Sequence, residues 1–534
     1  MRQLFDERVA SLADYSLGNL FAENKIGLEK ESLRVGPDGV IAQTDHPTAL
    51  GASLTHPSIT TDYSEALLEF VTPPFSGHEQ LMSYLRDCQA FVYSKMDNEL
   101  LWATSMPCVL AGESSIPLAK YGDSNLGNMK TTYRRGLGLR YGRVMQVIAG
   151  VHFNFSFSKS FWDFFQELEK DKGDHQTFIT KSYFQMIRNF QRFGWLIPYL
   201  FGASPAVCKS FLAGQETNME VFDETTLYYP YATSLRMGDI GYQNSKEDKS
   251  GIRVNYDTLE NYIKSLSHAV STKYEPYEKM GVKTNGKYKQ LNANLLQIEN
   301  EYYSSVRPKQ LGAVYEMPVN MLKDRGVAYV ELRSLDVNVY EPMGISEDTL
   351  YFLEAFSLFC LLETDEVISE EECREITQNM QDVAHHGRNP TIQLRRNGKA
   401  VGLKQWASEI FDQMESVCEI LDKNMTGTPY LSALNRYRQR IEDPDATPSA
   451  KMIREMRDNK EGFYQFSLRK SQEHDAFFRS MKIDESRIAY FQQLSEKSIE
   501  EQLKIEQADV LNFDNFLDHY FNQTLGAQQP YVND

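Results

Sequence analysis

The chain has 534 residues, with 56 Lys and Arg against 74 Asp and Glu, so its formal net charge at pH 7 is −18. This acidic balance argues against a nucleic-acid partner, because phosphate binding needs a basic face. The sequence holds no run of about 18 apolar residues, and acidic residues stand near its start where a signal peptide would be apolar. We therefore predict a cytoplasmic protein without a membrane segment. Six cysteines without a C-x-x-C pair predict free thiols and no zinc site.

The most informative segment is residues 27–35, which is patterned like a strand and carries Glu29 and Glu31. Side chains two residues apart in a strand share a face, so the two carboxylates lie close together. Like charges at this spacing need a cationic partner, and a divalent metal such as Mg²⁺ takes oxygen ligands. An isolated E-x-E pattern is also typical of a solvated edge strand.

Three further segments read as strands with polar side chains among apolar ones: residues 62–71, with Asp62 in the entering turn and Glu69 in the strand; residues 147–155, with His152 and Asn154 on one face; and residues 327–335, with Glu331 and Arg333 on one face. Each alone has an ordinary explanation, such as a hydrogen-bonded histidine or a cross-strand salt bridge. Together they supply carboxylates, an imidazole and a guanidinium to one sheet whose opposite face is apolar. This set suits two or more Mg²⁺ ions that hold a nucleoside triphosphate, with Arg333 stabilising a transferred phosphoryl group.

Periodicity predicts the remaining elements. Helices are expected over 78–101 and 176–191, and the chain reads as helical from about 403 onward, at 406–421, 431–441 and 485–521. The Asn397-Gly398 pair predicts a hairpin within 391–401. Residues 281–288 have the G-x₄-G-K spacing of a phosphate-binding loop, but Tyr288 replaces the required Ser or Thr and no buried strand precedes it. We interpret Asn285-Gly286 as a second hairpin turn.

Eight separated runs, in the same order, resemble the bacterial (type 1) glutamate-cysteine ligases. They are residues 27–35, 59–70, 105–108, 133–142, 192–206, 230–236, 296–301 and 331–336. The resemblance is collinear over roughly residues 20 to 345 and loosens past about 365. It implies an α+β fold of the glutamine-synthetase-like type, in which a curved, mostly antiparallel sheet forms a funnel-shaped active site with helices packed outside. We expect a single unit over 1–534, with the catalytic sheet and site in 20–345 and a mainly helical C-terminal region, 403–534, packed on it.

The resemblance also implies an activity. It predicts a ligase that uses ATP to join the γ-carboxylate of L-glutamate to the amine of L-cysteine through γ-glutamyl phosphate, the first step of glutathione biosynthesis. The implied cofactors are two or more Mg²⁺ or Mn²⁺ ions, with ATP as co-substrate. Feedback inhibition by glutathione is a further expectation, whereas no obligate protein partner and no appended ATP-grasp module are expected.

Carried over residue by residue, the resemblance assigns roles at the site. The implied metal ligands are Glu29, Glu31, Asp62, Glu69, His152 and Glu331. Arg333 would clamp the phosphoryl group and Arg236 would hold the glutamate carboxylate; with Glu331, these form the implied catalytic set. The substrate-binding residues would be Tyr133, Leu137, Gln146, Tyr242 and Tyr303 around cysteine, together with Asn154 and Arg236. Two other functions stay open: a phosphotransferase that releases a free acyl phosphate, and a nucleotide-binding regulator with an inactive site.

Overall fold

The computed structural model describes residues 2–14, 20–107, 109–212, 214–241, 252–313, 315–364, 366–423 and 425–523. Within these residues the main sheet has seven strands in the order β11-β12-β5-β1-β3-β2, with β4 paired to β1. Its strands are β1 (Lys25–Val35), β2 (Ile59–Thr61), β3 (Leu67–Val71), β4 (Leu100–Leu101), β5 (Gly150–Ser156), β11 (Val306–Lys309) and β12 (Tyr329–Asp336). Every pairing among them is antiparallel, which confirms the predicted sheet.

The register of the central strands brings the predicted polar residues opposite one another. Glu29 pairs with His152 across β1 and β5, and Glu31 pairs with Glu69 across β1 and β3. Directly opposed residues share a face of the sheet, so these side chains lie on one side. The opposite side is apolar, with buried side chains that include Leu28, Phe70, Phe153 and Leu332.

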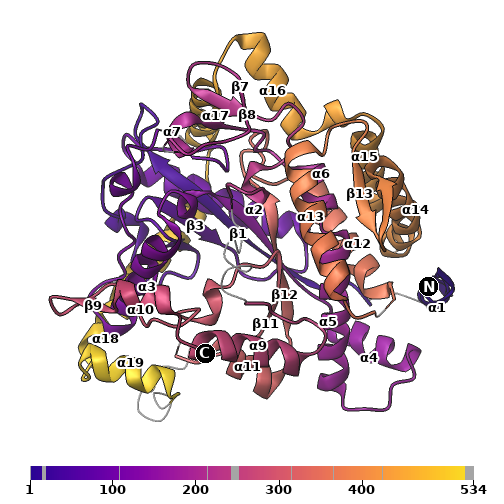
Figure 1. Cartoon of the computed structure of the whole chain (residues 1–534), viewed down its shortest axis with the longest axis horizontal. Coiled ribbons are helices and arrows are strands. Elements are labelled where there is room, and N and C mark those ends of the chain that lie inside the picture. Colours follow the sequence, from indigo (N-terminus) through magenta and orange to yellow (C-terminus); the bar gives the residue numbers. More distant parts are fainter. Residues whose placement is uncertain are drawn as a thin grey trace.

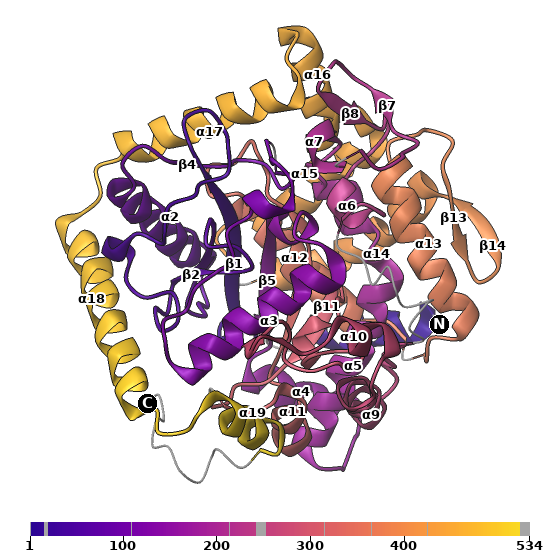
Figure 2. The same ribbon diagram turned by 60° about the vertical axis from the view of Figure 1, so that its left-hand side comes forward.

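Helices cover the apolar face of the sheet. α2 (His78–Lys95) packs on β1 and β3, while α5 (His175–Phe193) and α6 (Leu196–Phe201) pack on β12. α12 (Glu347–Leu362) lies behind α2 and α5 and is apolar around its whole circumference, as expected for a helix buried on all sides. α3 (Asn125–Tyr141) crosses in front of β1 and β5 on the other side (Figure 2). The polar face is therefore overlaid by α3.

The remaining elements complete the shell. The helices are α1 (Arg2–Asp14), α4 (Lys159–Leu168), α7 (Lys209–Leu212), α9 (Leu259–Ser271), α10 (Glu275–Met280), α11 (Pro318–Arg325), α13 (Glu370–His386), α14 (Leu403–Asp422), α15 (Pro429–Glu442), α16 (Pro448–Asn459), α17 (Phe463–Ser480), α18 (Glu485–Ala508) and α19 (Phe513–Phe521). The small sheets are β6 (Ala206–Cys208) with β8 (Thr226–Tyr228) and β7 (Glu220–Val221), β9 (Lys283–Thr284) with β10 (Lys287–Tyr288), and β13 (Gln393–Arg396) with β14 (Lys399–Gly402). Figure 1 shows α12 to α15 gathered on one side of the main sheet.

Both predicted hairpins are confirmed. Asn397 and Gly398 have φ of 53° and 75°, and Asn285 and Gly286 have φ of 50° and 78°. Positive φ at both central residues is the requirement of a tight primed turn, which explains the Asn-Gly sequence at each site. Residues 281–288, which have the spacing of a phosphate-binding loop, therefore contain a short hairpin.

Two predictions about local structure need correction. The helix expected over 78–101 ends at Lys95, and residues 100–101 form β4, because Met96 is already extended and Asp97-Asn98 favour a turn. Cys88, Cys360 and Cys418 are free, but Cys208 is disulfide-bonded, so the expectation of free thiols is wrong there. Cysteine spacing along a chain carries no information on which thiols the fold brings together.

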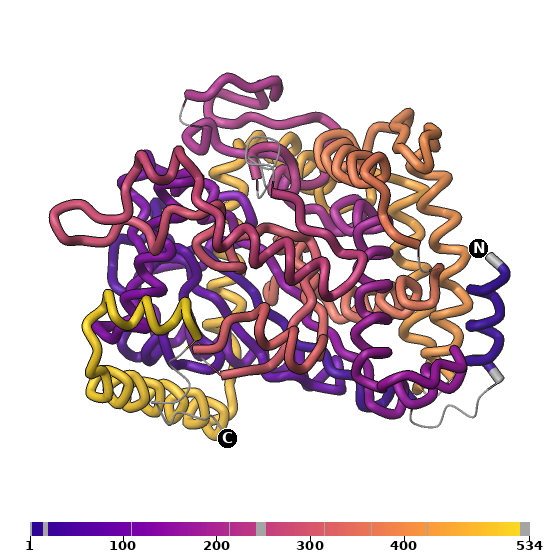
Figure 3. The backbone as a smooth tube through the Cα atoms, turned by 60° about the horizontal axis from the view of Figure 1, so that its bottom comes forward, coloured from indigo at the N-terminus to yellow at the C-terminus, as the bar shows by residue number. Residues whose placement is uncertain are grey.

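The C-terminal helices run along the outside of the molecule and return to its front. α17 packs on α2 and α18 also contacts α2, after which α19 contacts α3. Figure 3 shows the last helices of the chain, in yellow, on the outside of the molecule. The region expected to be helical over 485–521 is thus two helices, because the side chain of Asn512 caps a new helix at α19. No helix in the described ranges combines the length and the apolar character that a membrane crossing needs.

Candidate active site

A cavity of about 590 Å³ lies between the polar face of the sheet and α3. Its walls contain all six residues predicted as metal ligands, namely Glu29, Glu31, Asp62, Glu69, His152 and Glu331. Arg236 and Arg333 also line it. The alternation of the strands explains this gathering, because side chains two residues apart, such as Glu29 and Glu31 in β1 or Glu331 and Arg333 in β12, lie on the same face of the sheet.

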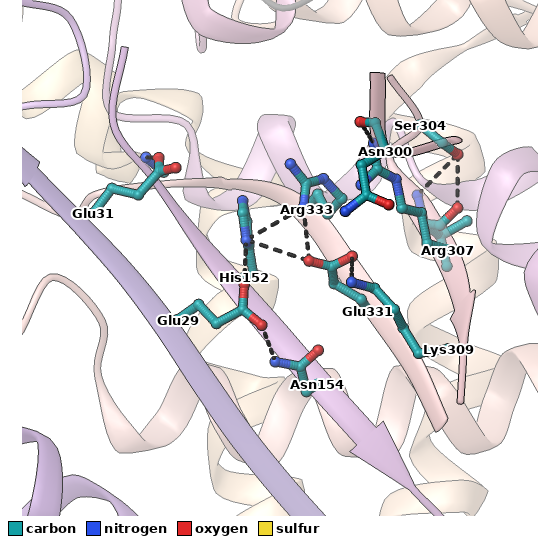
Figure 4. Close-up of polar contacts among 12 residues, drawn as sticks. Glu29, Glu31, His152, Asn154, Asn300, Ser304, Arg307, Lys309, Glu331 and Arg333 are labelled. Atoms are coloured by element: carbon teal, nitrogen blue, oxygen red, sulfur yellow. Dashed lines mark hydrogen bonds and ion pairs between the residues drawn. The ribbon is translucent and has the colours of Figure 1, made fainter. Parts of the chain in front are cut away.

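Three of these residues form a close cluster. The side chains of Glu29, His152 and Glu331 each offer a ligand atom within 4.8 Å of the others, and no other described residues form such a group of three or more. His152 Nδ1 lies 2.9 Å from Glu29 Oε2 and 3.4 Å from Glu331 Oε1. Figure 4 shows the three side chains converging from three adjacent strands. One imidazole and two carboxylates are a suitable donor set for a divalent cation.

The charges around the cluster hold it in a metal-binding protonation state. Burial raises the pKa of Glu331, but the nearby cations Arg333 and Lys309 outweigh burial and hold this pKa well below its usual range. Burial and the nearby Arg333 lower the pKa of His152, which favours the neutral imidazole that binds metals. These shifts favour the anionic form of Glu331 and the neutral form of His152.

The other predicted ligands lie in the same cavity but outside this cluster. Burial, followed by repulsion from Asp62, raises the pKa of Glu31 to about 8. Burial and the carboxylates of Glu29, Asp62 and Glu31 raise the pKa of Glu69 well above its usual range. Asp62 is the most exposed of them, and its carboxylate is 3.3 Å from Arg134. The raised pKa values favour the protonated forms of Glu31 and Glu69 as long as no further cation lies beside them.

Arg236, which lines the same cavity, is held by its buried surroundings. It comes from the short 3-10 turn Leu235–Met237, is 1% exposed, and donates from Nη2 to the backbone oxygen of Arg333 at 2.8 Å. A Cβ on Gly150 would lie 2.2 Å from this Nη2, so glycine is needed there to admit the guanidinium. Asp336 Oδ1 lies 3.9 Å from Arg236 Nη1. The Asp336 carboxylate accepts hydrogen bonds from the hydroxyls of Ser204 and Ser234.

Of the predicted substrate-binding residues, Tyr133, Leu137, Gln146 and Tyr303 line the cavity. Asn154 does not line it but donates from Nδ2 to Glu29 Oε1 at 3.0 Å, so the structure places it as a support for a cluster residue. Tyr242 lies outside the described residues. The roles of these residues in substrate binding stay predictions.

The sequence reasoning did not assign four cations that line the cavity. Lys130 and Arg134 come from α3, and Arg307 and Lys309 come from β11. Helix spacing predicts the first pair, because Lys130 and Arg134 share a helix face with Tyr133 and Leu137. Arg307 and Lys309 share a face only in a strand, and a short strand with a central proline, such as 306–309, carries little periodic signal.

Comparison with known proteins decides the family. The family model described as glutamate-cysteine ligase matches residues 9–383. A glutamate–cysteine ligase of Alcanivorax borkumensis is 45% identical over 523 residues, which cover 97% of this chain and 99% of that protein. The chain belongs to the glutamate-cysteine ligase family.

Solved structures agree with this family. A crystal structure of glutamate–cysteine ligase from Francisella tularensis, in complex with AMP, matches with a TM-score of 0.88 and 35% identity, covering 94% of this chain and 98% of that one. A bifunctional glutathione synthetase from Pasteurella multocida matches with a TM-score of 0.72 at 24% identity, covering 90% of this chain and 57% of that one. The second likeness shows the fold alone. The predicted family and fold class are both confirmed.

Proposed function

We propose that this chain joins the γ-carboxylate of L-glutamate to the amine of L-cysteine at the expense of ATP, giving γ-glutamylcysteine, ADP and phosphate. The observation that carries the proposal is the Glu29–His152–Glu331 cluster beside Arg333 in the cavity of a chain of this family. This is the first step of glutathione synthesis. A nucleotide substrate is supported by the AMP complex of the Francisella relative.

The side chains present fit a divalent metal. Glu331 Oε2 is buried and accepts no hydrogen bond within the described residues, which leaves an acceptor without a directed donor. We propose that Glu29, His152 and Glu331 hold one Mg²⁺ or Mn²⁺ ion, and that Glu31, Asp62 and Glu69 serve further ions. Bound there, the ions would supply positive charge that neutralises the phosphates of ATP and the charge that develops on the transferred phosphoryl group.

The first half of the reaction activates glutamate. An oxygen of its γ-carboxylate attacks the γ-phosphorus of ATP, the bond to the ADP oxygen breaks, and γ-glutamyl phosphate forms. Arg333 binds the phosphoryl oxygens during this transfer, because its guanidinium lies beside Glu331 at the edge of the cluster. Arg236 holds the α-carboxylate of glutamate in the same orientation throughout.

The second half forms the amide. The cysteine amine attacks the activated carbonyl carbon, the C–N bond forms, the C–O bond to phosphate breaks, and the amine loses a proton. Tyr133, Leu137, Gln146 and Tyr303 surround the small thiol side chain in this proposal. Inhibition by glutathione, the cytoplasmic location and the lack of an obligate protein partner stay predictions.

A product assay tests the proposal. The purified protein is incubated with ATP, Mg²⁺ and glutamate, with and without cysteine, and the products are identified by mass. We expect γ-glutamylcysteine only when cysteine is present. Acyl phosphate as the sole product would indicate a phosphotransferase, and nucleotide binding without any product would indicate a regulator.

A further inference from the structure

Lys309 pairs with a buried carboxylate of the Glu29–His152–Glu331 cluster from the edge of the sheet. It is the last residue of β11, at the edge of the main sheet, and its Nζ lies 3.0 Å from Glu331 Oε2. The Lys309 side chain is 30% exposed and lines the cavity, whereas the Glu331 side chain is 1% exposed. Figure 4 shows Lys309 reaching Glu331 from the side opposite Glu29 and His152.

The two oxygens of Glu331 are held in different ways. Oε1 accepts a hydrogen bond from Arg333 Nη1 at 2.7 Å and faces His152 Nδ1 at 3.4 Å. Oε2 is close to the ammonium of Lys309, yet no hydrogen bond of acceptable geometry reaches it from the described residues. Lys309 therefore balances the charge of Glu331 as an ion pair without a directed hydrogen bond, and its side chain, which is 30% exposed and lines the cavity, can reach another anion there.

A divalent ion on the cluster would change this balance. An ion that contacts Glu331 brings two positive charges next to an ammonium that faces the same carboxylate. The ion and the Lys309 ammonium would repel each other strongly, because both would lie next to one carboxylate in a buried site. Lysine is a compact charge on a flexible stem, so its ammonium can move into the cavity, where the proposed function places the phosphates of ATP.

We propose that Lys309 is an exchangeable counter-ion. In the free enzyme its ammonium neutralises Glu331, and when metal and nucleotide bind, the ammonium moves to a phosphate oxygen of the nucleotide. This inference rests on the proposed function, because it needs a nucleotide in the cavity. It assigns a nucleotide contact to a residue of the edge strand. It also predicts that Lys309 couples metal binding to nucleotide binding, since the lysine opposes the metal alone and favours the nucleotide.

A purely structural role is the competing explanation. In that case Lys309 ties the edge strand β11 to β12 through Glu331, and its loss lowers the melting temperature without changing either affinity selectively. The two explanations predict opposite effects of Lys309 on metal affinity. A counter-ion that competes with the metal weakens metal binding, whereas a brace that positions Glu331 strengthens it.

The test compares Lys309→Met with the wild type in two binding measurements that need no turnover. Mn²⁺ binding without nucleotide is measured by calorimetry, and binding of β,γ-methylene-ATP is measured at saturating Mg²⁺. We expect Lys309→Met to bind Mn²⁺ alone several-fold more tightly and the nucleotide analogue about tenfold more weakly, the latter because one charged hydrogen bond is lost. By linkage, the nucleotide should enhance Mn²⁺ binding less in the variant.

Lys159→Met is the matched control. Lys159 is also ion-paired with a carboxylate, that of Asp163 at 3.2 Å, but it does not line the cavity. Both affinities should stay at the wild-type values in this variant. Lys309→Arg keeps the charge and should retain most of the nucleotide affinity.

The outcomes separate this inference from the proposed function. Weaker Mn²⁺ binding, or unchanged affinities with a lower melting temperature, would overturn the counter-ion and leave a structural brace. If the wild type forms γ-glutamylcysteine while Lys309→Met shows no opposite shifts, only this inference fails. If the opposite shifts occur while the wild type makes no amide, the proposed function fails and the counter-ion remains.

Discussion

The role of Arg333 can be tested most directly. A phosphoryl clamp and a structural partner of Glu331 predict opposite results for the conservative change Arg333→Lys. Its Nη1 donates to Glu331 Oε1 at 2.7 Å and approaches His152 Nδ1 at 3.5 Å. Its Nε is buried and makes no hydrogen bond with the described residues. One part of the planar fork is thus engaged by Glu331, while another donor is available for a phosphoryl oxygen.

The expected effect of Arg333→Lys follows from this geometry. Lysine keeps the charge and can still pair with Glu331, but it cannot present a second donor in the same plane. A hydrogen bond to a charged group contributes about 1.5–3 kcal/mol, which corresponds to a roughly 10- to 150-fold change in rate if the bond forms mainly in the transition state. We therefore expect kcat to fall about a hundredfold, with ATP binding changed by less than about tenfold.

The assay is steady-state turnover at saturating Mg²⁺, together with nucleotide binding and thermal melting for Arg333→Lys and Arg333→Ala. If Arg333 is only a structural partner of Glu331, the lysine variant keeps its activity and the alanine variant melts at a lower temperature, because breaking one side of a buried pair costs about 3–5 kcal/mol. A stable lysine variant with wild-type kcat would refute the phosphoryl clamp.

Three further changes test the surrounding site. Glu29→Gln should leave the protein folded but lower turnover by about two orders of magnitude, since one ligand charge is lost at a phosphoryl-transfer site; near-normal turnover at saturating Mg²⁺ would contradict its assignment. Gly150→Ala should raise the KM for glutamate at least several-fold because the added methyl displaces Arg236, and a selective rise for ATP instead would argue against that role. Burial lowers the pKa of Lys30 to about 7 from its ordinary value of 10.5, so the unfolded chain binds more protons between these pH values and the free energy of unfolding from this residue should rise with pH across that window. Lys30→Met should remove this slope in pH-dependent melting, and an unchanged slope would show that Lys30 stays charged.

The sequence was sufficient to predict the sheet face but not the whole cavity. Alternation along 27–35 and 327–335 placed Glu29, Glu31 and Glu331 correctly, because each strand is long enough to show its period. Alternation could not show which carboxylates approach His152. Among the described residues these are Glu29 and Glu331, and their approach depends on the strand order β12-β5-β1. Lys309 was missed because β11 has only four residues. Long-range pairing, and not local pattern, decides these positions.

Arg236 shows a second limit of the sequence. Its role was implied by resemblance alone, because the residues around it form a 3-10 turn without periodicity. The structure supplies the physical reason for its position. Gly150 at the start of β5 leaves room for the guanidinium, and a register shift in β12 between Leu332 and Leu335 falls next to Arg333, whose backbone oxygen accepts from Arg236. Such irregularities change the direction of side chains and cannot be foreseen from an alternating pattern.

The C-terminal helices extend the site beyond the part of the chain that resembled a ligase most clearly. Tyr520 of α19 lines the same cavity as Glu299, whose pKa is raised to about 7 by burial. α19 is tied to the front of the molecule by Asp514, which accepts hydrogen bonds from Lys283 and Tyr288 of the β9–β10 hairpin at 2.7 Å. The hairpin that imitates a phosphate-binding loop in sequence therefore anchors a helix that contributes to the cavity wall. This arrangement supports the proposal of a single unit, because a cavity that needs residues from both ends of the chain is complete only when the C-terminal helices are docked.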